Sequence, residues 1–421
     1  HNNKSTFVAY IDFSAAYDRI NRSLLWRKLE CMGLTGSMFQ ALQSLYNNVQ
    51  CCVKVGKTGT TTDWFSVNSG LRQGCLCSPL LFNIYINDLA VLIKESCNGV
   101  KIADDEKVCL LMYADDIVLL SESEEDLQHM LKVLESWCKT WDVVVNVKKS
   151  QIMHFRKAKD VATDFNFKFN DVIMDKVERY KYLGLMLDFS LNYNITVQYV
   201  SKSANRALGL LISRAKSLGG MSYQCFSKLY ESMVVPVIRY GAAIWGHREY
   251  SEINAVHNRM CRYFLGVNKY TPNVAIQGDM GLRVPWQHQW IEIIRQWCRV
   301  HDMQDVRLNK RIYIWSKDVR GSTWYSRLVA MLHKTNLSDY LFHDSINKDM
   351  LISDLKEKLE NMFYQKWSAE LFKLESKSKK GNNKLRTYNT ERLCIRMLCI
   401  YYNAEMSSFC HGPAKMWNCS N

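Results

Sequence analysis

Two neighbouring aspartates, Asp115 and Asp116, interrupt the apolar segment VCLLMYADDIVLL at residues 108–120. Each flanking run is short and apolar, as in a buried strand, so the segment is predicted to be a β-hairpin inside a sheet with two carboxylates at its tip. Tight hairpin turns favour glycine or asparagine because their central residues adopt positive φ. This tip contains neither residue, which indicates that the turn is kept for its charge.

A third carboxylate, Asp12, lies near the end of a second apolar strand, FVAYIDF at residues 7–13. If the two strands lie side by side, Asp12 and Asp115 converge on one anionic pocket. Such a pocket suits two Mg²⁺ ions about 3.5–4 Å apart, which clamp the attacking and leaving oxygens of a phosphoryl transfer. Magnesium takes oxygen ligands and needs only one or two protein carboxylates. The alternative is that these acids are separate turn or helix-cap residues.

Charge and length limit the classes of protein to consider. The chain has 421 residues, enough for two or three domains, and carries 55 Lys plus Arg against 41 Asp plus Glu, a net charge of +14. This surplus favours a polyanionic partner, because neutralising phosphates releases counterions. There is no signal peptide and no apolar stretch of membrane-spanning length. We therefore expect an intracellular protein of the nucleus and cytoplasm that is neither secreted nor membrane-bound.

The fifteen cysteines are scattered, and no CxxC pair is present. In an intracellular chain they are expected to be free buried thiols. The one region worth testing for zinc is the C-terminal end, with Cys394, Cys399, Cys410, His411 and Cys419. Their spacings lack the close-paired ligands of zinc knuckles, so a structural role is favoured and zinc stays an alternative.

Apolar periodicity predicts the elements around the acids. Helices are expected at residues 21–34, 37–46, 78–89 and 124–141, the third with Ser78 as its N-cap and Pro79 at its first position. Strands are expected at 143–147 and 151–155, with a hairpin at 180–185. Residues 51–68 read as a β-arm, on which Lys54 and Lys57 either contact a nucleic-acid backbone or simply lie on the surface.

The loop from Gly70 to Gly74, GLRQG, precedes the third predicted helix. Its flexible backbone could lie against a nucleotide, with Gln73 donating a hydrogen bond. As an isolated motif this signal is weak, because glycine-rich loops before helices are common.

The order of these segments is more specific than any one of them. The succession DFSAAYD, GLRQGCLCSPLLFNIYINDL, LLMYADDIVLLS, KTWDVVVNVKKSQIMHF and YKYLGLMLD strongly resembles the palm of reverse transcriptases, above all those of non-LTR (LINE-type) retrotransposons. The resemblance covers residues 5–190 closely and continues more loosely through Gly281. It implies an α+β fold: a right-hand polymerase palm, an antiparallel sheet with helices packed on one face, then a helical thumb and a mainly helical C-terminal region.

The resemblance also assigns roles at the site. Asp12 and Asp115 would ligate both metals with Asp116 beside them, and the backbone carbonyl of Phe13 would help to hold the nucleotide-side metal. Tyr17 falls where the family places the aromatic residue that blocks a ribose 2′-hydroxyl and so selects deoxynucleotides. An ordinary core aromatic is the alternative for Tyr17.

Further roles come from the same resemblance. Contacts with the incoming nucleotide would come from Arg72, Gln73 and Gly74. The hairpin that grips the primer 3′ end would be Tyr182, Leu183 and Gly184. Lys148 or Lys149 matches the palm lysine that protonates departing pyrophosphate, a role that suits lysine because burial lowers its pKa. Paired surface lysines are the alternative.

The implied function is RNA-directed DNA synthesis, with an RNA template, a DNA primer, dNTPs and two Mg²⁺ ions, or Mn²⁺ in their place. The chain begins eleven residues before Asp12, whereas the relatives carry a fingers region and an endonuclease upstream. We therefore expect a truncated copy of reduced activity. The alternative is an impaired retroelement fragment that only binds RNA or DNA. A nucleotide cyclase is disfavoured, because it needs neither thumb nor primer grip.

Three domains are expected. Residues 1–190 would be the palm with most of the fingers missing, and 191–285 a helical thumb whose basic residues contact phosphates without reading sequence. Residues 286–421 would be a helical region in which nucleic-acid binding stays open. Its aromatic residues at helical spacing, such as those of 286–301, are predicted to be core, and the basic stretch 373–386 could contact RNA. The oligomeric state is left open.

Overall fold

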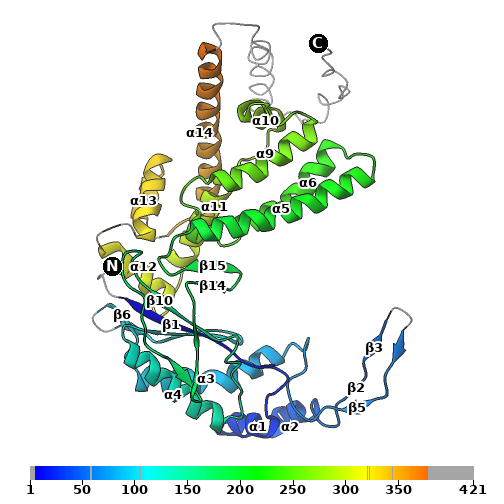
Figure 1. The fold of residues 1–421 in the computed structure, drawn as a ribbon, viewed down its shortest axis with the longest axis vertical. Coiled ribbons are helices and arrows are strands. Elements are labelled where there is room, and N and C mark those ends of the chain that lie inside the picture. The colour runs from blue at the N-terminus through cyan, green and yellow to red at the C-terminus, as the bar shows by residue number, and fades with distance from the viewer. Residues whose placement is uncertain are drawn as a thin grey trace. The chain divides into compact units, whose positions relative to one another are not determined.

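The computed structural model describes residues 5–377 except 57, 58, 104, 105, 320, 322 and 344, and describes only the backbone of 103, 106 and 372–377. The chain divides into two compact units, His1–Asn192 and Tyr193–Asn421 (Figure 1). Several sequence predictions fall outside the described residues: the zinc alternative at Cys394, Cys399, Cys410, His411 and Cys419, the role of Lys57, and most of the basic stretch 373–386.

The first unit is built on a five-stranded sheet with the strand order β13, β10, β1, β9, β8. The strands are β1 (Thr6–Asp12), β8 (Leu110–Tyr113), β9 (Asp116–Ser121), β10 (Gln151–Phe155) and β13 (Asp175–Lys176). The pairs β1 with β9, β1 with β10 and β8 with β9 are antiparallel, and β10 with β13 is parallel. The predicted palm sheet and acid-tipped hairpin are therefore confirmed, with one parallel strand at the edge.

The central strand β1 is apolar throughout because both of its faces are covered. Alternate residues point to opposite faces of a strand. Phe7, Ala9 and Ile11 join the core beneath the helices, whereas Val8 and Tyr10 join a smaller cluster on the other face. Asp12 continues the second set, so the strand itself aims this carboxylate away from the main core.

Helices cover one face of the sheet, as predicted. They are α1 (Arg22–Cys31), α2 (Gly36–Ser44), α3 (Ser78–Ser96) and α4 (Glu124–Thr140). The apolar stripe of α4 is fully buried against the sheet through Leu127, Met130, Leu131 and Leu134. Figure 1 shows α3 and α4 beside each other beneath β1 and β10.

A hairpin of β14 (Arg179–Tyr182) and β15 (Leu185–Asp188) packs on the opposite face. The ring of Tyr180 stacks on that of Tyr10, with centroids 3.9 Å apart. Leu183 and Gly184 form its two-residue turn and both have positive φ, 44° and 82°, as a type I′ hairpin turn requires. The predicted hairpin at 180–185 is confirmed.

Short ladders complete the first unit. The predicted arm consists of β2 (Gln50–Cys51) paired with β5 (Phe65–Ser66), and β3 (Lys54–Val55) paired with β4 (Thr60–Thr61). Figure 1 shows it as a narrow extension beyond α2, and its Lys54 is exposed. The remaining ladders are β6 (Val100–Ala103) with β7 (Glu106–Val108), and β11 (Lys168–Phe169) with β12 (Val172–Ile173).

Two local predictions are wrong. Residues 143–147 form no strand, only an isolated bridge between Val145 and Phe13, because the chain turns at 146–150 to enter β10. Ser78 is not the cap of α3: the N-cap is Cys77, and the Ser78 hydroxyl instead donates to the Arg72 carbonyl, 2.7 Å away. The cap prediction failed because this hydroxyl has a partner in the preceding loop.

The prediction of free buried cysteines holds in part. The described cysteines are free, and buried at 97, 109, 138, 261 and 298. Cys31, Cys51 and Cys225 are exposed. The prediction of buried thiols is therefore wrong at these three positions.

The second unit is helical. Its elements are α5 (Asn194–Ser217), α6 (Tyr223–Met233), α7 (Val235–Arg239), α8 (Ala242–Trp245), α9 (Ser251–Leu265), α10 (Asn273–Met280), α11 (Pro285–His301), α12 (Leu308–Asp318), α13 (Trp324–Lys334), the 3₁₀ helix η1 (Ser338–Phe342) and α14 (Lys348–Lys377). Figure 1 shows α5 and α9 running alongside each other. The domain boundaries at 190 and 285 stay predictions.

The aromatic residues of α11 are core, as predicted. Trp290, Ile294 and Trp297 pack with the buried face of α14. None of the described helices is long and apolar enough to cross a membrane. The packing of α11 on α14 shows that this unit is stabilised by the burial of amphipathic helix faces against one another.

The second unit also buries ionisable imidazoles. His257 on α9 is 1% exposed, and its Nδ1 lies 3.1 Å from the Tyr230 hydroxyl. Burial lowers the pKa of His257 to about 3, helped by the neighbouring His288. Burial likewise lowers the pKa of His288 and of His247 to about 4. These three side chains are neutral in the folded protein at pH 7.

Mild acid is expected to unfold the second unit. An unfolded histidine has a pKa near 6.5, so between pH 6.5 and the folded values the unfolded chain binds more protons, and stability falls as pH falls. His257 alone should cost about 2 kcal/mol between pH 7 and pH 5. Denaturant unfolding of the full chain at both pH values measures this. His257→Asn should show a shallower pH dependence than the unmodified chain, and an unchanged dependence would contradict the assignment.

Candidate active site

The three predicted acids lie at one end of the sheet. In the β1 and β9 ladder Asp12 is directly opposite Asp116, and in the hairpin Tyr113 is opposite Asp116. Opposite residues of antiparallel strands project from the same face, so the carboxylates of Asp12 and Asp116 share the face that carries Tyr10. Asp115 follows Ala114 in the turn itself. The sequence paired Asp12 with Asp115, whereas the register places Asp116 directly across and Asp115 one position beyond, at the tip.

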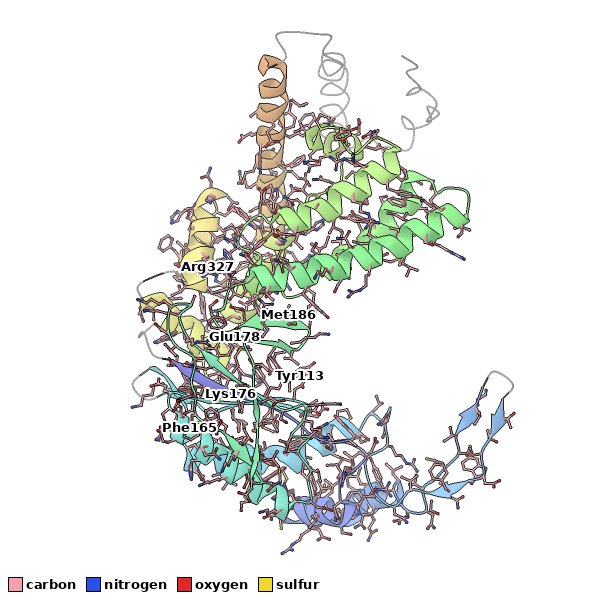
Figure 2. The ribbon with its side chains drawn as sticks, in the orientation of Figure 1. Tyr113, Phe165, Lys176, Glu178, Met186 and Arg327 are labelled. Carbon is pink, nitrogen blue, oxygen red and sulfur yellow. The ribbon has the colours of Figure 1, made fainter. Side chains whose placement is uncertain are left out.

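The acids act on one another electrostatically. Burial raises the pKa of Asp116, and the charges of Asp115 and Asp12 raise it further. Burial and then the charge of Asp115 raise the pKa of Tyr17. Asp115 and Asp12 therefore lie within electrostatic range of Asp116, and Asp115 within range of the Tyr17 hydroxyl. Tyr113 at the end of β8 is 67% exposed and is labelled in Figure 2, so the tip of this hairpin is open to solvent.

A closed set of hydrogen bonds fixes the end of β1. The Asp12 amide donates to the Ser150 hydroxyl at 3.0 Å, and that hydroxyl donates to the Asn146 carbonyl at 2.9 Å. The Asn146 amide in turn donates to the Asp12 carbonyl at 2.8 Å. Ser150 is fully buried. The backbone that carries Asp12 is therefore held at both its donor and its acceptor.

The same bonds orient the carbonyl of Phe13. Successive carbonyls of an extended strand point to opposite sides. Because the Asp12 carbonyl points toward Asn146 on the β10 side, the Phe13 carbonyl points toward β9 and the acid-tipped turn. This direction is the one that the predicted metal contact requires.

Lys148 and Lys149 lie in the turn between Asn146 and Ser150. Both side chains are exposed. The structure does not show the burial that would favour a proton donor, and the exposure of both lysines fits the alternative of paired surface lysines. Their role in catalysis stays a prediction.

The loop Gly70–Gly74 packs against the bend that follows Asp12. The Leu71 amide donates to the Tyr17 carbonyl at 2.8 Å, and the Gln73 amide group donates to the Asp18 carboxylate at 2.9 Å. Gly70 has φ of 78°, and a Cβ there would lie 2.5 Å from the Asp18 carbonyl oxygen. Only glycine permits this approach. The loop and the bend thus form one unit, from which the side chain of Arg72 is exposed.

The matched family agrees with this geometry. Residues 1–187 match the model of the family "Reverse transcriptase (RNA-dependent DNA polymerase)". Residues 1–187 form a reverse transcriptase domain. Members of this family use divalent metal ions. The α+β palm expected from the resemblance is therefore the fold of this domain.

Individual relatives are similar over part of their length. A probable RNA-directed DNA polymerase from transposon BS of Drosophila melanogaster is 26% identical over 65% of this chain and 30% of its own. The RNA-directed DNA polymerase from mobile element jockey of Drosophila funebris is 23% identical over 66% of this chain and 30% of its own. The chain thus spans about 30% of the length of these relatives. Among solved structures, an apo telomerase from Candida tropicalis aligns over 83% of this chain and 53% of its own, with 15% identity and a TM-score of 0.34.

Tyr17 of the reverse transcriptase domain is held rigidly. Its ring stacks on that of Phe82 in α3, with centroids 4.5 Å apart and planes 15° apart. It is only partly buried. One face of the ring is thus fixed, and the charge of Asp115 acts on the hydroxyl; its role in selecting the sugar stays a prediction.

Arg22 is a residue of the reverse transcriptase domain that sequence reasoning missed. Its guanidinium donates to the carbonyls of Gly70, Val67 and Ser69 at 2.9, 2.8 and 3.0 Å, and to that of Tyr46 at 3.2 Å. It therefore ties the start of α1 to the segment that leads into the Gly70–Gly74 loop. No spacing signal could have found it, because its acceptors are backbone carbonyls.

Replacing Arg22 should loosen this loop. Arg22→Gln removes charge-assisted bonds to at least two carbonyls and is expected to cost about 2–3 kcal/mol of stability. If this loop contacts the incoming nucleotide as predicted, the KM for dNTP should also rise several-fold, because the loop that carries Gln73 is no longer fixed. Urea unfolding and steady-state primer extension measure the two effects. The control is Arg27→Gln, an exposed arginine on the same helix, and equal effects of both variants would contradict the role of Arg22.

Three segments of the predicted site each contain one non-glycine residue with positive φ. Ala15 in the bend after Asp12, Ala114 in the acid-tipped turn and Leu183 in the β14–β15 turn have φ of 49°, 51° and 44°. A side chain with Cβ in this region costs roughly 1–2 kcal/mol. Such strain persists where the surrounding structure fixes the backbone, often at functional sites. The three predicted segments share this property.

The donors of the site suit a hard divalent cation. Among the described residues no group of three or more His, Cys, Asp or Glu side chains is already arranged as a metal site. However, Asp12 and Asp116 offer carboxylate oxygens from one face, and the mutual repulsion that raises the pKa of Asp116 is what a bound cation would relieve. The residues present therefore fit the metal that the family uses.

Proposed function

We propose that the chain is an RNA-directed DNA polymerase of a non-LTR retroelement. It adds a deoxynucleoside monophosphate to the 3′-hydroxyl of a DNA primer and releases pyrophosphate. The observation that carries this proposal is the register that sets Asp12 opposite Asp116, with Asp115 at the adjoining tip, inside a reverse transcriptase domain. The relatives described above are named as polymerases of this kind.

Asp12, Asp115 and Asp116, with the Phe13 carbonyl, would hold two Mg²⁺ ions. These ions supply charge stabilisation at the attacking and leaving oxygens. Phosphoryl transfer asks little more of a protein than positioning and charge. The hydrogen bonds between Asp12, Asn146 and Ser150 supply part of this positioning before substrate arrives.

Other side chains orient the two substrates. The Tyr17 ring, braced by Phe82, closes the space beside Asp115 against a ribose 2′-hydroxyl. Contacts with the nucleotide come from the fixed loop at Arg72, Gln73 and Gly74, of which Arg72 offers an exposed guanidinium to a phosphate. The primer end lies against the hairpin turn at Tyr182, Leu183 and Gly184. Lys148 or Lys149 gives a proton to departing pyrophosphate.

The partners follow from the same proposal. RNA is the template and DNA the primer, and the net charge of +14 favours such polyanions. The helical second unit carries basic residues along α5, including Lys202, Arg206 and Arg214, that suit phosphate contacts.

Primer extension tests the proposal directly. The chain is incubated with an RNA template, an annealed DNA primer, dNTPs and Mg²⁺. We expect DNA products that depend on the template, a comparable reaction with Mn²⁺, and none with a chelator. A chain that binds template and primer with unchanged affinity but never extends would establish the binding-only alternative instead.

A further inference from the structure

The second unit contains a pocket that the proposed polymerase site does not use. It has a volume of about 640 Å³ and lies between α9, α10, the start of α11 and α14. This volume is in the range of ordinary ligand sites. All of its lining residues belong to positions 249–370, so it is complete within the second unit.

The pocket has a surplus of positive charge. Its lining includes the cations Arg259, Arg262, Lys269 and Lys366 and the carboxylates of Glu249 and Glu370. Lys366 donates to Glu249 at 2.8 Å, so this pair is neutral as a whole. Three cations then face a single carboxylate. A ligand with negative charge is favoured over a neutral or cationic one.

Arg262 is held in place beneath this surplus. One of its Nη groups donates to the Thr271 carbonyl at 2.9 Å and to the Asn273 side chain at 2.6 Å. Its Nε is buried and, within the described part of the chain, has no hydrogen-bond partner. A buried donor without an acceptor is costly. An oxygen-rich group in the pocket would lie against a guanidinium whose hydrogen-bonding capacity is not filled.

The rest of the lining suits a nucleobase. Trp286 and Phe363 are 6% and 7% exposed and supply apolar surface. Asn254, Asn258 and Gln277 supply amide groups, and the Gln277 amide already donates to Asn258 at 2.8 Å. An apolar wall accommodates the flat face of a base, and side-chain amides read its hydrogen-bonding edge. Cations, amides and rings together match a nucleotide better than an inorganic anion.

An exposed aromatic residue next to the pocket favours a strand over a free nucleotide. Tyr270 is 80% exposed, and the Nζ of the pocket residue Lys269 lies 4.9 Å from its ring. An exposed ring beside a cation is a surface on which a neighbouring base can stack. We propose that this pocket takes one unpaired nucleotide of an RNA strand, through its phosphate and base, while adjoining nucleotides pass over Tyr270. This goes beyond primer extension and does not require it.

Binding without catalysis tests the proposal. The full chain is titrated with a fluorescent single-stranded RNA of mixed sequence, without Mg²⁺ or dNTP, at several salt concentrations. The double variant Arg259→Gln with Lys269→Gln should bind about tenfold more weakly. For this variant, a plot of the logarithm of the RNA-binding constant against the logarithm of the salt concentration should have a slope shallower by roughly 1.4, because two cations that contact phosphates of the strand are lost. Both side chains are exposed, so the fold should be retained.

Two further variants distinguish RNA binding in the pocket from general attraction of RNA to positive charge. Ala255→Trp fills the pocket without changing charge and should also weaken RNA binding about tenfold. Arg299→Gln, an exposed arginine of α11 outside the pocket, should change it less than twofold. Equal losses for the pocket and control variants, or no effect of Ala255→Trp, would overturn the proposal.

Competition distinguishes a strand from a free nucleotide. Millimolar AMP or ATP should displace the RNA only weakly, whereas unlabelled RNA should displace it fully. Full displacement by free nucleotide would show a nucleotide site and not a strand site, which contradicts the proposal as stated. The binding assay contains neither Mg²⁺ nor dNTP, and primer extension is not its readout, so failure of the polymerase proposal and failure of this one give different results.

Discussion

Asp115→Asn is expected to lower the rate of primer extension by about a thousandfold or more. Carboxylates that hold the catalytic cations control several kcal/mol of transition-state stabilisation, and each 1.4 kcal/mol is a factor of ten in rate. The change keeps the size of the side chain, and Asp115 lies at the turn outside the main core. Template–primer affinity and the unfolding midpoint should therefore remain close to those of the unmodified chain. Single-turnover extension measures the effect.

The other two acids complete this test. Asp12→Asn should be as severe as Asp115→Asn. Burial, and then repulsion by Asp115 and Asp12, raises the pKa of Asp116, so Asp116→Asn removes an unfavourable charge and should also stabilise the fold slightly. Asp160→Asn, an exposed acid of the same unit, is the control and should extend normally. A loss of less than tenfold in Asp12→Asn and Asp115→Asn would mean that these acids do not form the catalytic site.

Tyr17→Ala is expected to raise incorporation of ribonucleotides relative to deoxynucleotides by about a hundredfold, or close to 3 kcal/mol of discrimination. The reason is steric: the ring is fixed on Phe82 and stands beside Asp115, where the sugar must lie. The ratio of kcat/KM for rNTP and dNTP on one template measures the change. Extension with dNTP should fall only modestly.

The conservative variant distinguishes the ring from its hydroxyl. Tyr17→Phe keeps the stacking partner and should keep the discrimination against rNTP. If Tyr17→Ala instead lowers extension with both nucleotides equally and destabilises the domain, Tyr17 is an ordinary core aromatic. That was the alternative left open by the sequence.

Local patterns were sufficient to predict the frame of the site. The strands that carry Asp12 and Asp116 are continuous apolar runs, and α4 has apolar residues at helical spacing along one face. The pattern of apolar residues therefore predicted each of them. The order of the segments then identified the palm. What periodicity could not give is register: only the ladder shows that Asp116, and not Asp115, lies directly across from Asp12.

The sequence could not predict which side chains donate hydrogen bonds to backbone carbonyls. Arg22 binds carbonyls of residues 46–70, and any residue type presents a carbonyl, so nothing in the sequence marks the acceptors. Lys28 on α1 is 7% exposed and donates to Asp88 of α3 at 2.6 Å. Its Nζ also lies 3.6 Å from the centre of the Trp141 ring. A buried lysine of this kind depends on partners that are brought together only by the fold.

In the second unit, too, the helices were predictable from the sequence and the contacts that depend on the fold were not. The sequence predicted a helical region over 191–285 and core aromatic residues at 286–301, and α5, α9 and α11 each bury one face. The pocket beside Arg262 was not predictable, because its lining comes from helices that are far apart in the sequence and from a surplus of charge visible only when they pack.

In the proposed mechanism, Asp12, Asp115 and Asp116 share bound divalent cations. Counting Mn²⁺ by electron paramagnetic resonance, on the full chain with template, primer and dNTP, tests it most directly. We expect two tightly bound Mn²⁺ ions in the unmodified chain and one or none in Asp12→Asn and in Asp115→Asn. Unchanged Mn²⁺ stoichiometry and affinity in both variants would contradict the account.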